Sequence, residues 1–166
     1  MKSIRLVSFL FVVFMATAAF AQSNGQAAFD KLKSLEGTWA GKASDGRDIQ
    51  VDFRVVSGGS AVMSEIHGAG EANMITMFHP DGDRLLMTHY CGVGNQPRMA
   101  GTLSSDGKTI SFNFLDATNV LPTQAGHMQQ LILTVVDSNH QTEQWDFLGQ
   151  DGKLHHHQTF DLQRTK

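Results

Sequence analysis

Cysteine and tyrosine each occur once in this chain of 166 residues, as the neighbours Cys91 and Tyr90. A single cysteine cannot form an internal disulfide, which excludes a small scaffold held together by disulfides. The sequence also lacks the CxxC and HExxH spacings of zinc sites, the P-loop and the G-x-S-x-G turn of serine hydrolases. No local motif therefore indicates a particular reaction, and the choice of candidate functional residues depends on the predicted fold.

Positive charge is scarce as well. The chain has 13 Lys and Arg against 16 Asp and Glu, a net charge of −3, and its Lys and Arg residues form no cluster. Proteins that bind nucleic acid usually carry a basic patch or stripe. The composition therefore argues against a nucleic-acid partner.

The longest apolar run lies at the start of the chain, and its features are those of an export signal. Lys2 and Arg5 precede the apolar residues 6–18, and Ala19-Phe20-Ala21 offers small residues at the −3 and −1 positions of a cleavage site. We predict a signal peptide over residues 1–21 and an exported mature domain over 22–166, periplasmic or secreted. Losing Lys2 and Arg5 takes the net charge from −3 to −5. No second apolar run is long enough for a membrane helix after cleavage.

The mature sequence predicts one short helix followed by strands only. Apolar residues at i, i+3 and i+6 in 28–35 indicate the helix, which Gly37 ends. About ten short segments with period-2 alternation follow, and Ile49 to Val55 and Ile110 to Phe114 are the clearest. Asp-Gly pairs at 45–46, 81–82, 106–107 and 151–152 separate apolar runs, which predicts two-residue hairpin turns with both residues at positive φ. Sequential hairpins without crossover helices predict an all-β, up-and-down antiparallel sheet that closes into a barrel.

Two stretches resemble known barrel families. Leu35-Glu36-Gly37-Thr38-Trp39 resembles the Gly-x-Trp signature of calycins, the lipocalin and fatty-acid-binding group. The resemblance implies that Trp39 closes one end of the barrel and that Arg164 packs over it. Residues 77–83, 88–91, 95–99, 127–128 and 142–145 resemble a family of exported bacterial calycin-like domains without an assigned function. The architecture is also distantly similar to nitrobindin, a ten-stranded haem barrel.

Residues 77–99 carry most of the candidate binding residues. In 84–91 the apolar phase includes His89 and Cys91, so both should face the interior while Tyr90 faces solvent. A buried imidazole needs a hydrogen-bonding partner, which we expect from Glu65 or His127, with backbone or threonine as the alternative.

The polar residues after Gly92-Val93-Gly94 complete the predicted ligand site. Asn95, Gln96 and Arg98 follow this corner, and the guanidinium of Arg98 suits a carboxylate or phosphate on the ligand. An ion pair between Arg98 and a carboxylate at the rim is the competing interpretation.

Methionine and histidine are the remaining notable residues. The predicted mature domain has six methionines, which would make an adaptable apolar lining or an ordinary filled core: Met63, Met74, Met77, Met87, Met99 and Met128. The run 155–157 is His-His-His, but alternation turns its members to different faces, so we predict a surface patch and no metal site.

These observations predict a small-molecule binding barrel without catalysis, for a small hydrophobic or anionic apolar ligand. A haem or nitric-oxide barrel with His89, His127 or His156 as axial ligand is one alternative. An isomerase or hydrolase that uses His89 with Glu65, with Cys91 as nucleophile, is the other. The sequence names neither a cofactor nor an oligomeric state.

Overall fold

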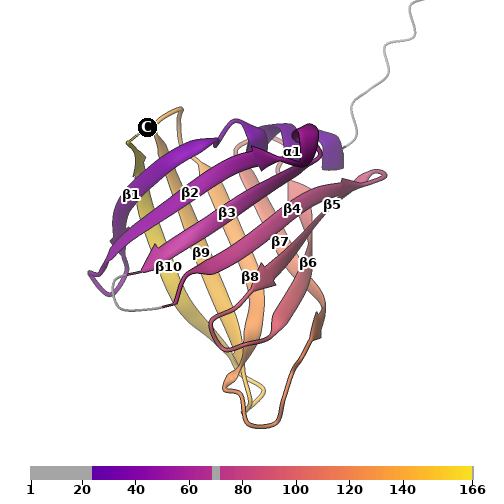
Figure 1. The fold of residues 1–166 in the computed structure, drawn as a ribbon, viewed down its shortest axis with the longest axis vertical. Coiled ribbons are helices and arrows are strands. Elements are labelled where there is room, and N and C mark those ends of the chain that lie inside the picture. The colour runs from indigo at the N-terminus through magenta and orange to yellow at the C-terminus, as the bar shows by residue number, and fades with distance from the viewer. Residues whose placement is uncertain (1–23, 69–71, 166) are drawn as a thin grey trace, which may run out of the picture.

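Alternating apolar and polar residues form ten antiparallel strands in the computed structural model, which describes residues 24–68 and 72–165 (Figure 1). The predicted signal peptide lies outside the described residues. Helix α1 spans Asn24–Lys33, so it begins four residues before the predicted start at Ala28. The strands are β1 Gly37–Ala43, β2 Asp48–Val56, β3 Ala61–Gly68, β4 Met74–Asp81, β5 Arg84–Tyr90, β6 Gln96–Leu103, β7 Thr109–Thr118, β8 Gly126–Val135, β9 His140–Gly149 and β10 Leu154–Arg164. A 3-10 turn, η1 (Ser57–Gly59), joins β2 to β3.

Each strand pairs with its neighbours in the chain, and β1 pairs with β10 to close the barrel. The closing register places Trp39 opposite Arg164 and Ala43 opposite Phe160. Closure gives each of the ten described strands a neighbour on both sides, which is the physical advantage of this arrangement. The predicted all-β, ten-stranded up-and-down barrel with one short N-terminal helix is confirmed.

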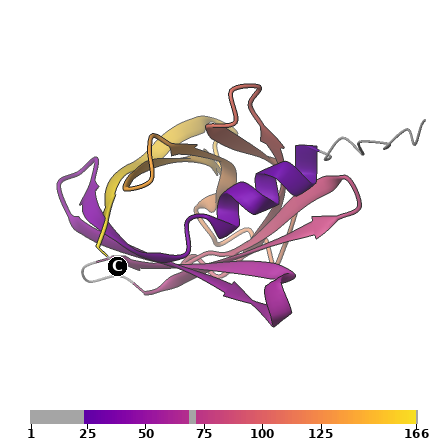
Figure 2. The ribbon, with the colours of Figure 1, turned by 90° about the horizontal axis from the view of Figure 1, so that it is seen from above.

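Helix α1 lies at one end of the barrel, which we call the closed end (Figures 1 and 2). Its apolar side buries Ala28, Phe29 and Leu32. The side chain of Asn24 fixes the start of the helix, because its amide donates to the Leu103 carbonyl and its oxygen accepts from the Leu103 N–H. This contact with β6 explains why the helix begins earlier than its apolar pattern predicts.

Trp39 fills the closed end below the helix. Its ring is fully buried, and its Nε1 donates to the Leu35 carbonyl at 2.8 Å. The guanidinium of Arg164 lies 4.2 Å from the ring centroid and donates to the carbonyls of Ser34, Glu36 and Ser138. The structure thus brings Trp39 and Arg164 together as the calycin resemblance implies.

The Asp-Gly turns have a different geometry from the one predicted. The glycines Gly46, Gly82, Gly107 and Gly152 adopt positive φ, whereas the aspartates before them do not. In three of the four turns the aspartate side chain accepts a hydrogen bond from the backbone N–H two residues later: Asp45 from Arg47, Asp106 from Lys108 and Asp151 from Lys153. The expectation that both turn residues adopt positive φ was therefore wrong. In three of these turns the hydrogen bond from the backbone to the aspartate carboxylate shapes the turn, and only the glycine adopts positive φ.

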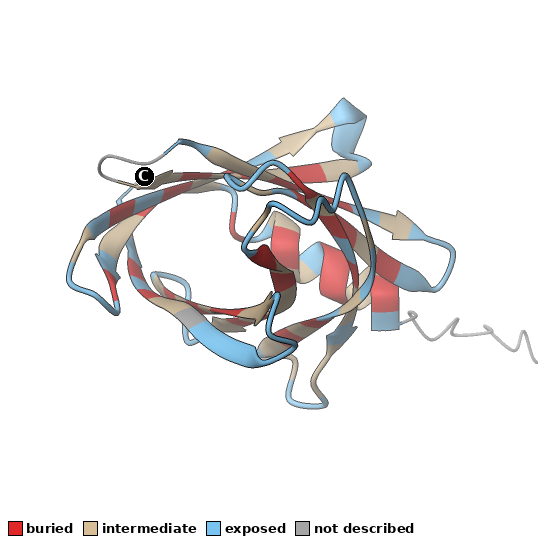
Figure 3. Cartoon of the chain, turned by 90° about the horizontal axis from the view of Figure 1, so that it is seen from below, coloured by how far each residue is buried: buried red, intermediate tan, exposed pale blue. Residues whose placement is uncertain are grey.

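Buried residues recur along the strands between less buried ones (Figure 3), and the side chains of this inward phase form the core. On β5 this phase is Leu85, Met87 and His89, and the outward Tyr90 is 50% exposed, as predicted. The end opposite α1 is formed by the turns 44–47, 91–95, 119–125 and 150–153, which we call the rim. Among the described residues, no helix is long and apolar enough to cross a membrane.

Candidate functional site

His89 is the most deeply buried titratable group of β5, with only 1% of its surface exposed. Its neighbour across the β4–β5 pair is Thr76, and the two side chains share one face of the sheet. The Thr76 hydroxyl lies 2.8 Å from the His89 Nδ1, so a threonine on the adjacent strand supplies the hydrogen-bonding partner. Neither Glu65 nor His127 does so.

The other nitrogen of this imidazole, Nε2, has no hydrogen-bonding partner among the described residues. The ring lies against Trp145 of β9, with 4.7 Å between the ring centroids. Burial lowers the pKa of His89 to about 4, because the charged form would lose its hydration. At neutral pH the side chain is therefore an uncharged imidazole with one unpartnered nitrogen.

A cavity of about 30 Å³ adjoins His89 inside the barrel. Its wall includes Met74 of β4, Met128 of β8 and Trp145, with Ile49, Ile66 and Phe160 as further apolar residues and Arg47 and Gln158 on the side toward the rim. The volume suits about one water molecule or a single ion. The cavity is mostly apolar, and the unpartnered His89 is one of its few polar groups.

A larger groove of about 410 Å³ lies beside this cavity at the rim. Met74 and Met128 line both spaces and so form the wall between them. The other residues of the groove are Ala72, Cys91, Gly92, Val93, Ala125 and Phe147. Volumes of roughly 300–1,000 Å³ are usual for small-molecule sites. We call this space the rim groove.

Cys91 lines the rim groove, as its inward phase predicted. Burial raises the pKa of its thiol above the usual value, although backbone hydrogen bonds from Val93 and Gly92 oppose the shift. The thiol is therefore mainly protonated at neutral pH, which works against a role as nucleophile.

Side-chain amides hold the rim together beside the groove. Asn95 is fully buried, and its Nδ2 donates to the Gly126 carbonyl at 2.8 Å. Gln124 donates to the Val93 carbonyl at 3.0 Å, and Gln150 donates to the Pro122 carbonyl at 2.5 Å. These contacts connect the turns 91–95, 119–125 and 150–153. Asn95 therefore supports the rim groove without lining it.

The structure corrects the predicted positions of Arg98 and Gln96. Pro97 and Met99 are the buried residues of β6, so Arg98 and Gln96 take the outward phase. Arg98 forms a two-pronged ion pair with Asp116, in which its Nε lies 2.6 Å from Oδ1. Gln96 donates to the Gly94 carbonyl and accepts from Thr118. Neither residue shares a cavity with His89, and the ion-pair interpretation of Arg98 is the correct one.

Glu65 also lies outside the predicted cavity. Val62, Ser64 and Ile66 occupy the inward phase of β3, so Glu65 faces outward, where it pairs with Arg54 at 2.5 Å.

His127 lines neither the cavity beside His89 nor the rim groove. Its immediate neighbour Met128 lines the interior, and its ring stacks on Phe114 at 4.4 Å. The predicted convergence of Glu65, His127, Gln96 and Arg98 on His89 is therefore wrong, whereas His89 and Cys91 do line adjoining spaces.

Sequence reasoning missed a row of polar side chains on β9. Gln141 and Glu143 are buried on the same face as Trp145. Trp145 Nε1 donates to Glu143 Oε2 at 3.0 Å, while Glu143 Oε1 and both amide atoms of Gln141 have no partner among the described residues. Burial raises the pKa of Glu143 to about 7, which the hydrogen bond from Trp145 only partly opposes. The alternation that places Trp145 inward also places Glu143 inward, and so could have found it.

The six methionines divide into three pairs. Met63 and Met77 are opposite each other on β3 and β4 and are only partly buried, whereas Met87 and Met99 are opposite each other on β5 and β6 and fully buried. Only Met74 and Met128 line the cavity and the rim groove. Methionine therefore contributes two residues to the lining of these spaces, fewer than the six that the sequence suggested.

His155 and His156 make ordinary side-chain pairs. His155 lies 3.4 Å from Asp151, and His156 lies 3.0 Å from Asp146 and contacts Thr159. Within the described part of the chain, no group of three or more His, Cys, Asp or Glu residues is placed to hold a metal ion.

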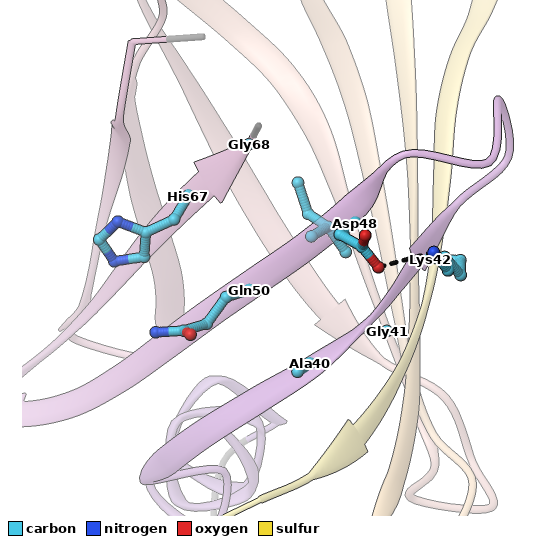
Figure 4. Close-up of a pocket in the computed structure, with 8 residues that line it drawn as sticks. Ala40, Gly41, Lys42, Asp48, Gln50, His67 and Gly68 are labelled. Atoms are coloured by element: carbon cyan, nitrogen blue, oxygen red, sulfur yellow. Dashed lines mark ion pairs between the residues drawn. The ribbon is translucent and has the colours of Figure 1, made fainter. Parts of the chain in front are cut away.

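A hollow of about 590 Å³ lies beside β1, β2 and β3 (Figure 4). Its polar groups pair with one another or with nearby carboxylates, as in the 2.7 Å contact between Lys42 and Asp48. Gln50 donates to Asp52, and His67 lies 3.1 Å from the same carboxylate. Because its polar groups are already paired and exposed, this hollow is a weaker candidate than the cavity and the rim groove.

No family model matches this chain, and no curated protein matches its sequence. Among solved structures, the crystal structure of Rv2717c from M. tuberculosis is similar, with a TM-score of 0.59 and 17% sequence identity. The similarity covers 84% of this chain and 98% of that one. At this level of identity the comparison shows the fold alone: this chain and Rv2717c share a β-barrel fold over most of their lengths.

Proposed function

We propose that this protein binds a small, mostly apolar molecule in the rim groove. The observation that carries the proposal is the apolar groove of about 410 Å³, which opens at the end of the barrel away from α1. Phe147, Met74 and Met128 supply an adaptable apolar wall, since thioether side chains fit irregular shapes. None of the described residues that line the groove is charged, which favours an uncharged ligand over the anionic one predicted from Arg98.

Haem was the first alternative, and the described geometry does not accommodate it. The cavity beside His89 holds about 30 Å³, and Trp145 lies against the imidazole. A porphyrin would have to displace both Trp145 and the wall formed by Met74 and Met128. His127 and His156 are engaged with Phe114 and Asp146.

The enzyme alternative has little support in this geometry. Glu65 is paired with Arg54 outside the barrel, which separates the proposed acid–base partners. Cys91 has a raised pKa, the opposite of the shift that activates a thiol nucleophile.

A filling mutation tests the rim groove. Ala125 lines the groove and is exposed, so Ala125→Trp should fill the space without disturbing the core. We expect it to weaken binding of the neutral apolar dye Nile red at least tenfold. Ala40→Trp, in the hollow beside β1, is the matched control and should leave binding unchanged. Equal binding by both variants, or no dye binding by the wild type, would contradict the proposal.

We also propose that the protein is exported and that its mature form begins at Gln22. The support is the basic, apolar and A-x-A sequence of residues 1–21. Cell fractionation followed by intact-mass measurement tests this, and a cytoplasmic protein that retains residues 1–21 would refute it.

A further inference from the structure

Four of the side chains that line the small cavity beside His89 carry neutral, electron-rich groups. His89 presents an unpartnered Nε2 and is 1% exposed, Met74 and Met128 are thioethers, and Trp145 offers an aromatic ring. The cavity that they line holds about 30 Å³, too little for an organic molecule but enough for a single ion.

We propose that this cavity is a binding site for a soft monovalent cation, Cu(I) by preference, held by His89 Nε2 and the thioethers of Met74 and Met128 beneath the Trp145 ring. Thioether and imidazole ligands favour Cu(I), whereas Mg²⁺, Ca²⁺ and Mn²⁺ prefer oxygen ligands. The site is distinct from the rim groove, although the two spaces share Met74 and Met128.

The hydrogen bond to Thr76 prepares His89 for this role. When Nδ1 donates to the Thr76 hydroxyl, which lies 2.8 Å away, the lone pair of the ring is on Nε2. Histidines that bind metals usually have this arrangement, because a partner on the other nitrogen fixes the tautomer and the ring orientation.

The surroundings favour a single positive charge over a double one. The three proposed ligands are neutral, and Ile49, Ile66 and Phe160 make most of the remaining wall apolar, with Arg47 and Gln158 only on the side toward the rim. An ion of higher charge would lose more hydration energy in such a place. Trp145 adds cation–π attraction, which is stronger where water is excluded. The nearby cation Arg47 has its charge opposed by Asp45, whose Oδ2 accepts from Arg47 Nε at 2.6 Å.

Competition for Cu(I) tests the site. The protein carries Cys91→Ser, so that the thiol of the rim groove cannot bind the metal, and Cu(I) is offered with bicinchoninate under anaerobic conditions. We expect one Cu(I) per molecule, and an affinity at least tenfold lower in Met74→Leu/Met128→Leu. Met87→Leu/Met99→Leu is the matched control, because these methionines are buried in the core and do not line the cavity. Methionine-to-leucine changes nearly conserve volume and should leave both variants folded.

A second measurement detects the bound ion directly and does not depend on a variant with weakened metal binding. With methyl-labelled methionine, Ag⁺ as a redox-stable substitute should shift the resonances of Met74 and Met128 and leave those of Met87 and Met99 in place. Quenching of tryptophan fluorescence by Ag⁺ should disappear in Trp145→Phe. Equal Cu(I) affinity in the two double variants, or unshifted Met74 and Met128 resonances, would overturn the proposal and leave only adventitious binding to exposed histidines. Neither assay involves the dye, so failure here is distinguishable from failure of the rim-groove proposal.

Discussion

Arg98 shows how the outward or inward phase of one residue decides its role. Its guanidinium faces Asp116 on the outside of β6 and β7, and both side chains are more than half exposed. Water and salt screen such a pair, so it contributes little to stability. We expect Arg98→Ala to leave the urea midpoint and the affinity for Nile red unchanged. Equilibrium unfolding and dye titration check this. If the variant folds but no longer binds the dye, Arg98 takes part in ligand binding after all.

Trp39 is the residue on which closure of the barrel depends. Its buried ring packs under Arg164 and donates to Leu35, which connects β1 to the segment after α1. Trp39→Ala should lower the free energy of unfolding by about 3–5 kcal/mol, the usual cost of removing a large buried aromatic side chain. Urea denaturation measures it. A loss below about 1 kcal/mol would show that the cavity collapses or that the ring is less well packed than the structure indicates.

At the scale of the element, β9 has an unfavourable feature: its inward face buries the polar side chains of Gln141 and Glu143. The folded pKa of Glu143, about 7, lies above the unfolded value of 4.5. The folded state therefore holds this proton more tightly, and stability is lost as pH rises from about 4.5 through 7. Because one pKa unit corresponds to about 1.4 kcal/mol, the ionised carboxyl costs about 3 kcal/mol at pH 8.

Glu143→Gln should remove this cost, since the amide is neutral and can still accept from Trp145. We expect the variant to be more stable than the wild type at pH 8 by up to about 3 kcal/mol and similar to it at pH 4.5. Urea unfolding at the two pH values is the measurement. A stability difference that does not change with pH would show that Glu143 does not titrate in this range.

For the whole molecule, His89 and Glu143 act in opposite directions. The pKa of His89 falls from 6.5 to about 4 on folding. Above pH 6.5 the imidazole is neutral in both the folded and the unfolded state, so its burial carries no ionisation cost, and stability is lost as pH falls from 6.5 toward 4. Glu143 has the reverse dependence between 4.5 and 7. Their effects nearly cancel from about pH 4.5 to 6.5.

The free energy of unfolding should therefore show a broad maximum in that window and decline on both sides. A series of urea titrations from pH 4 to pH 8 tests this. The lowered pKa values of Asp52, Asp106 and Asp151 add to the acid decline, because these carboxylates must be protonated there. A steady rise in stability from pH 5 to pH 8 would contradict it.

The sequence by itself determined the local properties of this protein. Period-2 alternation and the Asp-Gly turns predicted about ten strands and their order, and the apolar phase of residues 84–91 placed His89 and Cys91 inward and Tyr90 outward. These properties depend on residues one or two positions apart, and burying one face of each strand leaves little freedom in phase. The position of Trp39 at the closed end was implied instead by the resemblance of residues 35–39 to the calycin signature.

Only the tertiary structure decided which inward residues meet. Closing the sheet brings Trp145 of β9 against His89 of β5, and Met128 of β8 beside Met74 of β4, although no local pattern relates these strands. The same closure left Arg98 and Glu65 outside, because their strands bury Met99 and Ile66 on the other face. The contents of the cavity depend on strand tilt and on the register shifts in β8 and β10, which side-chain alternation does not encode.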